Sequence, residues 1–164
     1  MSRGIFASGT ASSAELSDCF DMPRARIYST SPVTLTSGLD TAVPFTSVRW
    51  DSHGMWDVGD PTKFVVQSGD DGYYRFGYNL RFANNATGTR RVGIWVNGTD
   101  RFWHSIDPAC SGIPTVKGAA GIEWPLAVGD YVELFAYQDS GGNLDLEVAS
   151  AYSLEFWISW FAVS

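Results

Sequence analysis

Residues 69–82, GDDGYYRFGYNLRF, restrict the fold of this 164-residue chain more than any other segment. After a polar turn, apolar side chains occupy every second position, and Arg75, Gly77, Asn79 and Arg81 lie between them. Successive side chains of a β-strand point to opposite sides, so this spacing predicts a strand with one buried face and one face toward solvent or a neighbour. The buried side chains are Tyr74, Phe76, Tyr78, Leu80 and Phe82.

From residue 25 onward the chain continues as short apolar or alternating runs separated by Gly, Pro, Asn and Asp. This pattern is typical of an antiparallel sandwich or barrel. Asn97-Gly98 predicts a type I′ turn, because both residues tolerate a positive φ. We predict an all-β fold of ten strands, over residues 26–30, 42–48, 63–67, 73–83, 90–97, 101–106, 115–124, 130–138, 144–149 and 154–163.

The last run, LEFWISWFAV at 154–163, is largely apolar on both faces. Trp157, Phe161 and Val163 share one face with Glu155 and Ser159, and the other face is entirely apolar. An antiparallel strand of this kind either packs on the core with one face and on a neighbouring subunit with the other, or is prone to aggregation. Seven Trp in an aromatic content of 15% also exceed what one small interior requires. We therefore predict an obligate oligomer.

Charge and hydropathy exclude two classes of partner. A net charge of −7 argues against binding to nucleic acid, and no segment approaches the roughly 20 apolar residues that cross a membrane. The first 18 residues lack the apolar core of a signal peptide. The length indicates one domain. Ser12 and Glu15 form a capping-box pattern that predicts a short helix over 13–20, ended by Pro23.

Several of these residues resemble a family signature. The spacing of Gly72, Tyr74, Phe76 and Tyr78, with Phe45, Asp51 and Trp56 upstream, resembles that of complement-1q globular heads in the complement-1q/tumour-necrosis-factor superfamily. The intervals on either side of Phe64 are longer than in that family, so the loops there differ. VGDYVELFAYQ at 128–138 and LEFWISWFAV resemble the last two strands of the family. The resemblance covers roughly residues 25–164.

The resemblance implies a ten-strand antiparallel jelly-roll sandwich that forms a homotrimer, with the last strand facing the trimer axis. Residues 25–164 would be the trimerisation domain, with Trp157, Phe161 and Val163 between subunits. Residues 1–24 lack a collagen-like stalk and would be a docking segment. The segments TGTRRVGIWVNGT and LAVGDYVELFAYQDSGG are most similar to the bacteriophage and prokaryotic versions of the domain. This resemblance implies a virion protein that is assembled in the host cytoplasm. It would decorate the head or form a spike, tail tip or fibre. The docking residues would be Ile5, Phe6, Leu16 and Phe20.

The chemistry of the chain argues against an enzyme. His53 and His104 are the only histidines, and no G-x-S-x-G nucleophile motif accompanies them. Asp70 and Asp71 are adjacent and precede Gly72, so they indicate a turn rather than the paired carboxylates of a glycosidase. We expect no catalytic residue and no resident cofactor.

The alternative is a soluble bacterial lectin-like module that binds surface glycans and could use calcium to do so. Asp51, Asp57 and Asp60 lie with His53 in one loop that can supply oxygen ligands to calcium, and the competing reading is a solvated loop whose Met55 and Trp56 tuck under the sandwich. Sugar rings can stack on an aromatic side chain such as that of Trp56, but burial at a subunit contact competes with this use. The other candidates for stacking are Trp103 and Trp124, and the distant Cys19 and Cys110 are expected to be isolated thiols rather than a disulfide.

Overall fold

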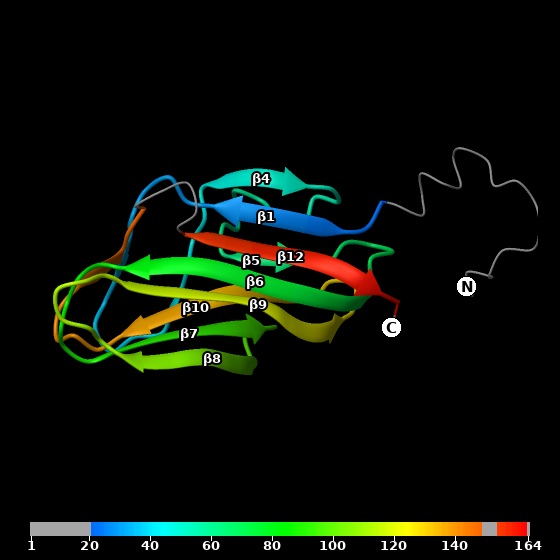
Figure 1. Ribbon diagram of the computed structural model, residues 1–164. Helices are drawn as coiled ribbons and strands as arrows, with labels where there is room; N and C mark the ends of the chain where they lie inside the picture. Colours follow the sequence, from blue (N-terminus) through cyan, green and yellow to red (C-terminus); the bar gives the residue numbers. More distant parts are fainter. Residues whose placement is uncertain (1–20, 149–153, 164) are drawn as a thin grey trace, which may run out of the picture.

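The computed structural model describes residues 21–148 and 154–163, with the backbone alone for 100–105. This part of the chain forms twelve strands in two antiparallel sheets packed face to face (Figure 1). Within it, no helix is long and apolar enough to cross a lipid bilayer. The predicted helix over 13–20 and the docking residues Ile5, Phe6, Leu16 and Phe20 lie outside the described residues.

The larger sheet has seven strands and brings the first and last strands together. β1 lies between β4 and β12, and β12 lies beside β6, so segments far apart in sequence are neighbours (Figure 1). β9 pairs with the other edge of β6. In order, the strands are β2 (Val33–Leu35), β11 (Leu144–Leu146), β6 (Gly72–Phe82), β12 (Glu155–Ala162), β1 (Arg24–Tyr28) and β4 (Ser47–Asp51), with β9 (Thr115–Leu126) beside β6.

The smaller sheet has five strands and is centred on β10. β7 and β8 form the hairpin around Asn97 and Gly98, whose φ values of 52° and 65° confirm the predicted turn. The strands are β3 (Thr41–Ala42), β10 (Tyr131–Gln138), β7 (Thr89–Val96) and β8 (Asp100–Pro108), with β5 (Lys63–Val65) also on β10.

The core lies between the two sheets. All five apolar side chains of β6 that the alternation predicts to be buried are at most 1% exposed, namely Tyr74, Phe76, Tyr78, Leu80 and Phe82. Phe156 on β12 reaches the same layer, where its ring lies 4.9 Å from that of Phe64 and 6.2 Å from that of Phe45. The all-β jelly-roll class is therefore confirmed.

The strand count differs from the predicted ten for local reasons. The run at 42–48 is divided, because the chain leaves β3 in the smaller sheet and enters β4 in the larger one. Between them Pro44, which has no N–H for a strand ladder, marks the crossing. The other addition, β2, has only three residues, too few for an alternation to be recognised.

The signature residues have structural roles in this fold. Phe45 and the aromatic residues of β6 are core side chains. Gly72 is required by close approach, because a Cβ there would overlap the carbonyl oxygen of Ala162 and the indole of Trp160. Asp51 holds its loop, and Trp56 packs against the core. The signature thus specifies the interior and the loop geometry of one end of the sandwich.

Candidate functional site

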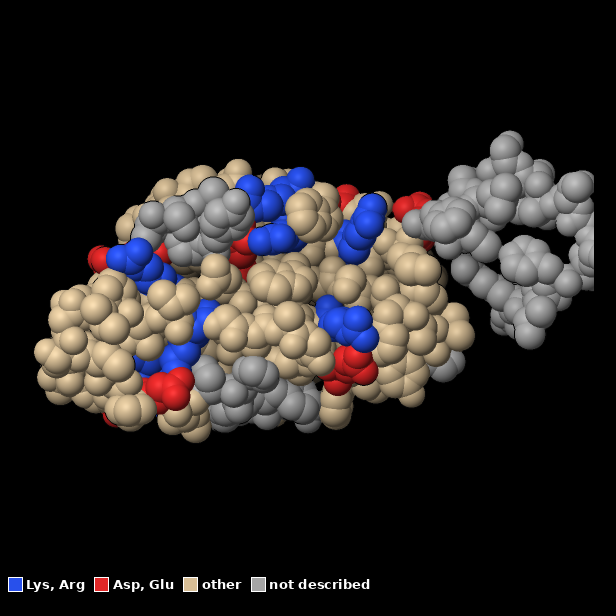
Figure 2. Space-filling view, in the orientation of Figure 1, with Lys and Arg blue, Asp and Glu red and all other residues tan. Residues whose placement is uncertain are grey.

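The outer face of the seven-stranded sheet gathers aromatic and basic side chains. Figure 2 shows the basic side chains over the strands on this side of the molecule, among a largely uncharged surface. One cross-strand row runs from Trp50 through Arg26 and Trp157 to Gly77, because these residues are register partners on β4, β1, β12 and β6. The predicted interface residue Trp157 therefore lies near the middle of this face.

Two indole rings flank one guanidinium in this row. The Arg26 guanidinium lies 5.4 Å from the ring centre of Trp50 and 5.1 Å from that of Trp157, within cation–π range. Trp157 is half-buried because its ring lies across Gly77, where a Cβ would overlap the indole. Trp50 remains 47% exposed at the edge of the sheet.

A buried carboxylate anchors the same row. Glu155 points to the outer face but is 0% exposed, because Arg26 and Arg49 cover it. Arg26 donates to Oε2, with its Nε at 3.1 Å, and Arg49 donates to Oε1, with its Nε at 2.6 Å. The Arg49 guanidinium also lies over the ring of Tyr28, at 4.5 Å. A single carboxylate thus fixes two arginines on the surface.

A second group lies nearer the end of β12. Phe161 is 38% exposed and Tyr73 is 41% exposed, with their ring centres 6.2 Å apart. Arg75 lies 5.0 Å from the Phe161 ring and pairs with Glu123 of β9 at 2.6 Å. Val163 follows with 66% exposure. The predicted interface residue Phe161 thus exposes apolar surface beside an ion pair, and Val163 lies just after the end of β12.

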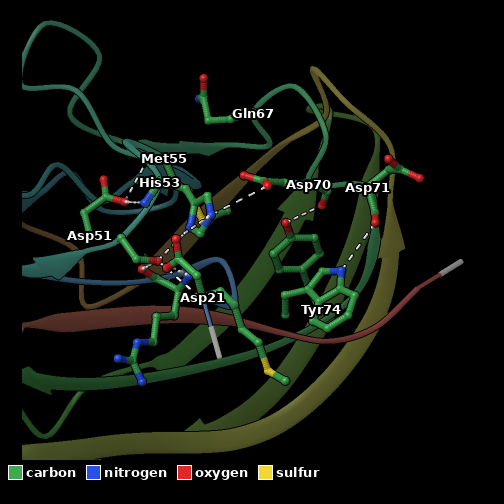
Figure 3. A network of polar contacts seen from close by, with 12 residues as sticks. Asp21, Asp51, His53, Met55, Gln67, Asp70, Asp71 and Tyr74 are labelled. Carbon is green, nitrogen blue, oxygen red and sulfur yellow. Dashed lines mark hydrogen bonds and ion pairs between the residues drawn. The ribbon is translucent and has the colours of Figure 1, made fainter. Parts of the chain in front are cut away.

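A polar network occupies one end of the sandwich, where the chain enters β1 (Figure 3). Asp51 Oδ1 accepts from the backbone N–H of Met55 at 2.9 Å and of His53 at 3.3 Å, and Oδ2 accepts from that of Trp56 at 2.9 Å. The His53 Nε2 lies 3.9 Å from Asp21 Oδ2 and 4.0 Å from Asp70 Oδ1. Asp51 therefore folds the loop that presents His53 to two other carboxylates.

Asp70 differs from its neighbour Asp71 in being 8% exposed. Burial raises the pKa of Asp70, an effect that the nearby His53 reduces. Its Oδ2 has no hydrogen-bond partner, whereas its backbone carbonyl accepts from the Tyr74 hydroxyl at 2.5 Å. Burial likewise raises the pKa of the Tyr74 hydroxyl. The expected turn at Asp70 and Asp71 thus carries one carboxylate that is directed inward.

The structure does not group the expected calcium ligands. Asp57 accepts from the backbone N–H of Gly59 at 2.7 Å, and Asp60 pairs with Lys63 at 2.8 Å. Asp51 is occupied by backbone donors, as described above. Among residues 21–148 and 154–163, no three His, Cys, Asp or Glu side chains are arranged to hold a metal ion.

The candidate stacking tryptophans, the two cysteines and His104 do not form a common site in the described part of the chain. Trp56 and Trp124 are partly buried and pack against the core, and Trp56 donates to the carbonyl of Pro61 at 3.3 Å. Cys110 is an exposed free thiol in the connection between β8 and β9. Figure 1 shows this connection at the end of the sandwich opposite the entry to β1. The side chains of Trp103 and His104 and all of Cys19 lie outside the described part.

Sequence reasoning missed the two ion pairs of the buried Glu155. Glu155 was visible as the one charged residue of LEFWISWFAV, but its partners lie 106 and 129 residues away. An isolated carboxylate in an apolar run is the signal that could have indicated a buried ion pair.

Comparison with known proteins places the fold. No family model matches this sequence, and no match was found among curated proteins. Among solved structures, the globular domain of zebrafish complement 1qA is 12% identical, with a TM-score of 0.59 over 87% of this chain and 99% of that chain. Murine APRIL at pH 8.0 is 15% identical, with a TM-score of 0.61 over 85% and 99%. Eiger TNF from S. frugiperda is 9% identical, with a TM-score of 0.55 over 87% and 94%.

These neighbours define the class of fold. The chain has the jelly-roll fold of complement-1q and tumour-necrosis-factor domains, as the signature residues predict. Its own surface chemistry must support any more specific statement of function.

Proposed function

We propose that this protein is a non-enzymatic structural or adhesion protein that works as a homotrimer, closed through the outer face of the seven-stranded sheet. The half-exposed apolar side chains on that face carry the proposal. Trp50, Tyr73 and Phe161 are each more than one third exposed in the single chain, yet Trp50 lies beside the Arg26–Glu155 pair and Phe161 beside the Arg75–Glu123 pair. Aromatic side chains and Arg are enriched at the centres of protein interfaces, and Lys is depleted there.

A test of the trimer compares two substitutions of exposed apolar side chains. Phe161→Asp, on the proposed interface, is expected to turn a trimer into monomers in sedimentation equilibrium. Ile113→Asp is the matched control, because Ile113 is 61% exposed in the connection between β8 and β9. Trp157→Asp is expected to give unstable or insoluble protein, because it also removes the ring over Gly77. A folded wild-type monomer at micromolar concentration would refute the proposal.

We further propose that the trimer belongs to a bacteriophage virion, as a head decoration or spike or as a tail-tip or fibre component. The resemblance of the sequence to bacteriophage versions of the domain supports this, and the docking segment would be residues 1–24. Immunolabelling of purified particles is expected to place the protein on the head or the tail. The same protein is tested on a glycan array with and without a chelator. Chelator-sensitive glycan binding with no particle label would instead indicate the lectin-like module.

A further inference from the structure

The point where the chain enters β1 is tied to the loop that carries His53. The Ser52 N–H donates to the Arg24 carbonyl at 3.0 Å, and the Arg24 N–H donates to Ser52 Oγ at 3.1 Å. The Ser52 hydroxyl also lies 3.2 Å from the Met22 carbonyl and 2.8 Å from His53 Nδ1. The entry segment, residues 21–23, is therefore held next to the ring of His53.

These contacts place the His53 ring between its own loop and two carboxylates. The Ser52 hydroxyl has one hydrogen and three acceptors within reach, namely Nδ1 of His53, the Met22 carbonyl and, at 3.3 Å, the Arg24 carbonyl. In either neutral tautomer the ring carries no charge, and its Nε2 faces the carboxylates of Asp21 and Asp70. A second proton makes the ring cationic and converts both contacts into ion pairs.

We propose that His53 is a pH-sensitive latch, which fastens the entry segment to the end of the sandwich when the ring is protonated and releases it when the ring is neutral. Histidine is the side chain whose charge changes most readily between pH 5 and 8. Asp21 belongs to the entry segment and Asp70 to the loop before β6, so the protonated ring joins two separate parts of the chain (Figure 3).

The charges around the ring favour this behaviour. Asp21, Asp70 and the adjacent Asp71 are acidic, and Asp51 holds the backbone of His53 itself. Arg24, on β1, is the basic residue joined to this loop, and its described bonds to Ser52 use backbone atoms. Because Asp70 is buried and its Oδ2 lacks a partner, a cationic ring beside it supplies compensation that a neutral ring cannot.

Hydrogen exchange of the amides of Arg24 and Ser52 tests the latch, because both amides donate across the junction. Protection factors, corrected for the intrinsic exchange rate at each pH, are measured between pH 5.5 and pH 8. In the wild type they are expected to fall by roughly two- to fivefold as the pH rises, the range of a partly exposed ion pair. In His53→Gln, which offers a neutral donor at every pH, they are expected to be constant.

Two further variants test whether the pH dependence comes from His53 and its carboxylate partners or from another titratable group. Asp70→Asn keeps the shape but removes one anionic partner, and it is expected to reduce the pH dependence. His104→Gln removes the other histidine of the chain and is expected to leave the dependence unchanged. A pH dependence that survives in His53→Gln, or protection that does not change with pH in the wild type, would overturn the proposal. The readout is local to each chain, so it is independent of whether the protein forms trimers.

Discussion

Single polar side chains hold the loops of this molecule in place. Asp51 accepts three backbone N–H groups. The fully buried Arg90 donates to the carbonyls of Asn85, Thr87 and Thr89, and the buried Gln138 closes the turn at residues 139–142. Such groups stabilise the fold only while their hydrogen-bond partners are present, because a buried polar atom without a partner lowers the free energy of unfolding.

At this scale, Asp51→Ala is expected to lower the free energy of unfolding by about 3 kcal/mol, because the acceptor of three backbone donors is lost. Asp51→Asn retains one carbonyl acceptor and should lose less. Urea unfolding of the three proteins at one protein concentration provides the measurement. Equal stability of Asp51→Ala and the wild type would contradict the assigned role.

Asp70→Asn is expected to stabilise the protein at neutral pH by about 1 kcal/mol, because the amide keeps the shape of the buried carboxylate but carries no charge. Burial raises the pKa of Asp70 from 3.8, so the folded state favours the protonated carboxyl. Its contribution to stability is complete below pH 3.8 and is lost as the pH rises through the raised pKa. Unfolding at pH 7 and near pH 3.5 should show the gain only at the higher pH. A gain of the same size at both values would exclude this explanation.

Individual strands show which features were predictable. The alternation in β6 predicted its bounds within one residue and its buried face completely. The division of 42–48 could not be predicted, because the same short run is used by two different sheets. The outward face of β12 was predicted to be largely apolar, with Glu155 on it, but the pairing of Glu155 with residues on β1 and β4 was not predicted. His53 and Asp70 were noted separately, since only the tertiary fold brings their loops together.

The buried ion pairs of β12 can be compared with an exposed one on the same sheet. Glu155→Gln is expected to cost about 3 kcal/mol, because Arg26 and Arg49 lose the charge that compensates them. Glu123→Gln breaks the Arg75 pair, where both side chains are about half exposed, and should cost at most about 1 kcal/mol. Thermal unfolding of both variants gives the comparison. Similar losses would mean that Glu155 is not a special anchor.

The whole molecule combines a closed core with an open apolar face. The sandwich interior is complete within one chain, whereas the exposed rings of the seven-stranded sheet have no cover in the described part of that chain. Substitutions in the core should therefore affect folding, whereas substitutions on the outer face should affect assembly.

If a homotrimer is the native state, its midpoint of thermal unfolding should rise with protein concentration, because assembly stabilises the folded chain by mass action. Trp50→Ser should reduce this dependence, and it should have little effect on the secondary structure of the chain because the ring is 47% exposed. Scanning calorimetry and circular dichroism over a hundredfold range of concentration are the measurements. A midpoint that is independent of concentration in the wild type would argue for a monomer.

The contact of Trp157 with Gly77 has a consequence for how this face can vary. The ring occupies the space that a side chain at position 77 would need, so the two positions share one volume across neighbouring strands. Relatives with a side chain at position 77 should therefore carry a side chain smaller than tryptophan at position 157. In a double-mutant cycle, Gly77→Ala should be harmful beside the indole and tolerated beside Trp157→Leu, which would make the pair a coupled unit of sequence divergence.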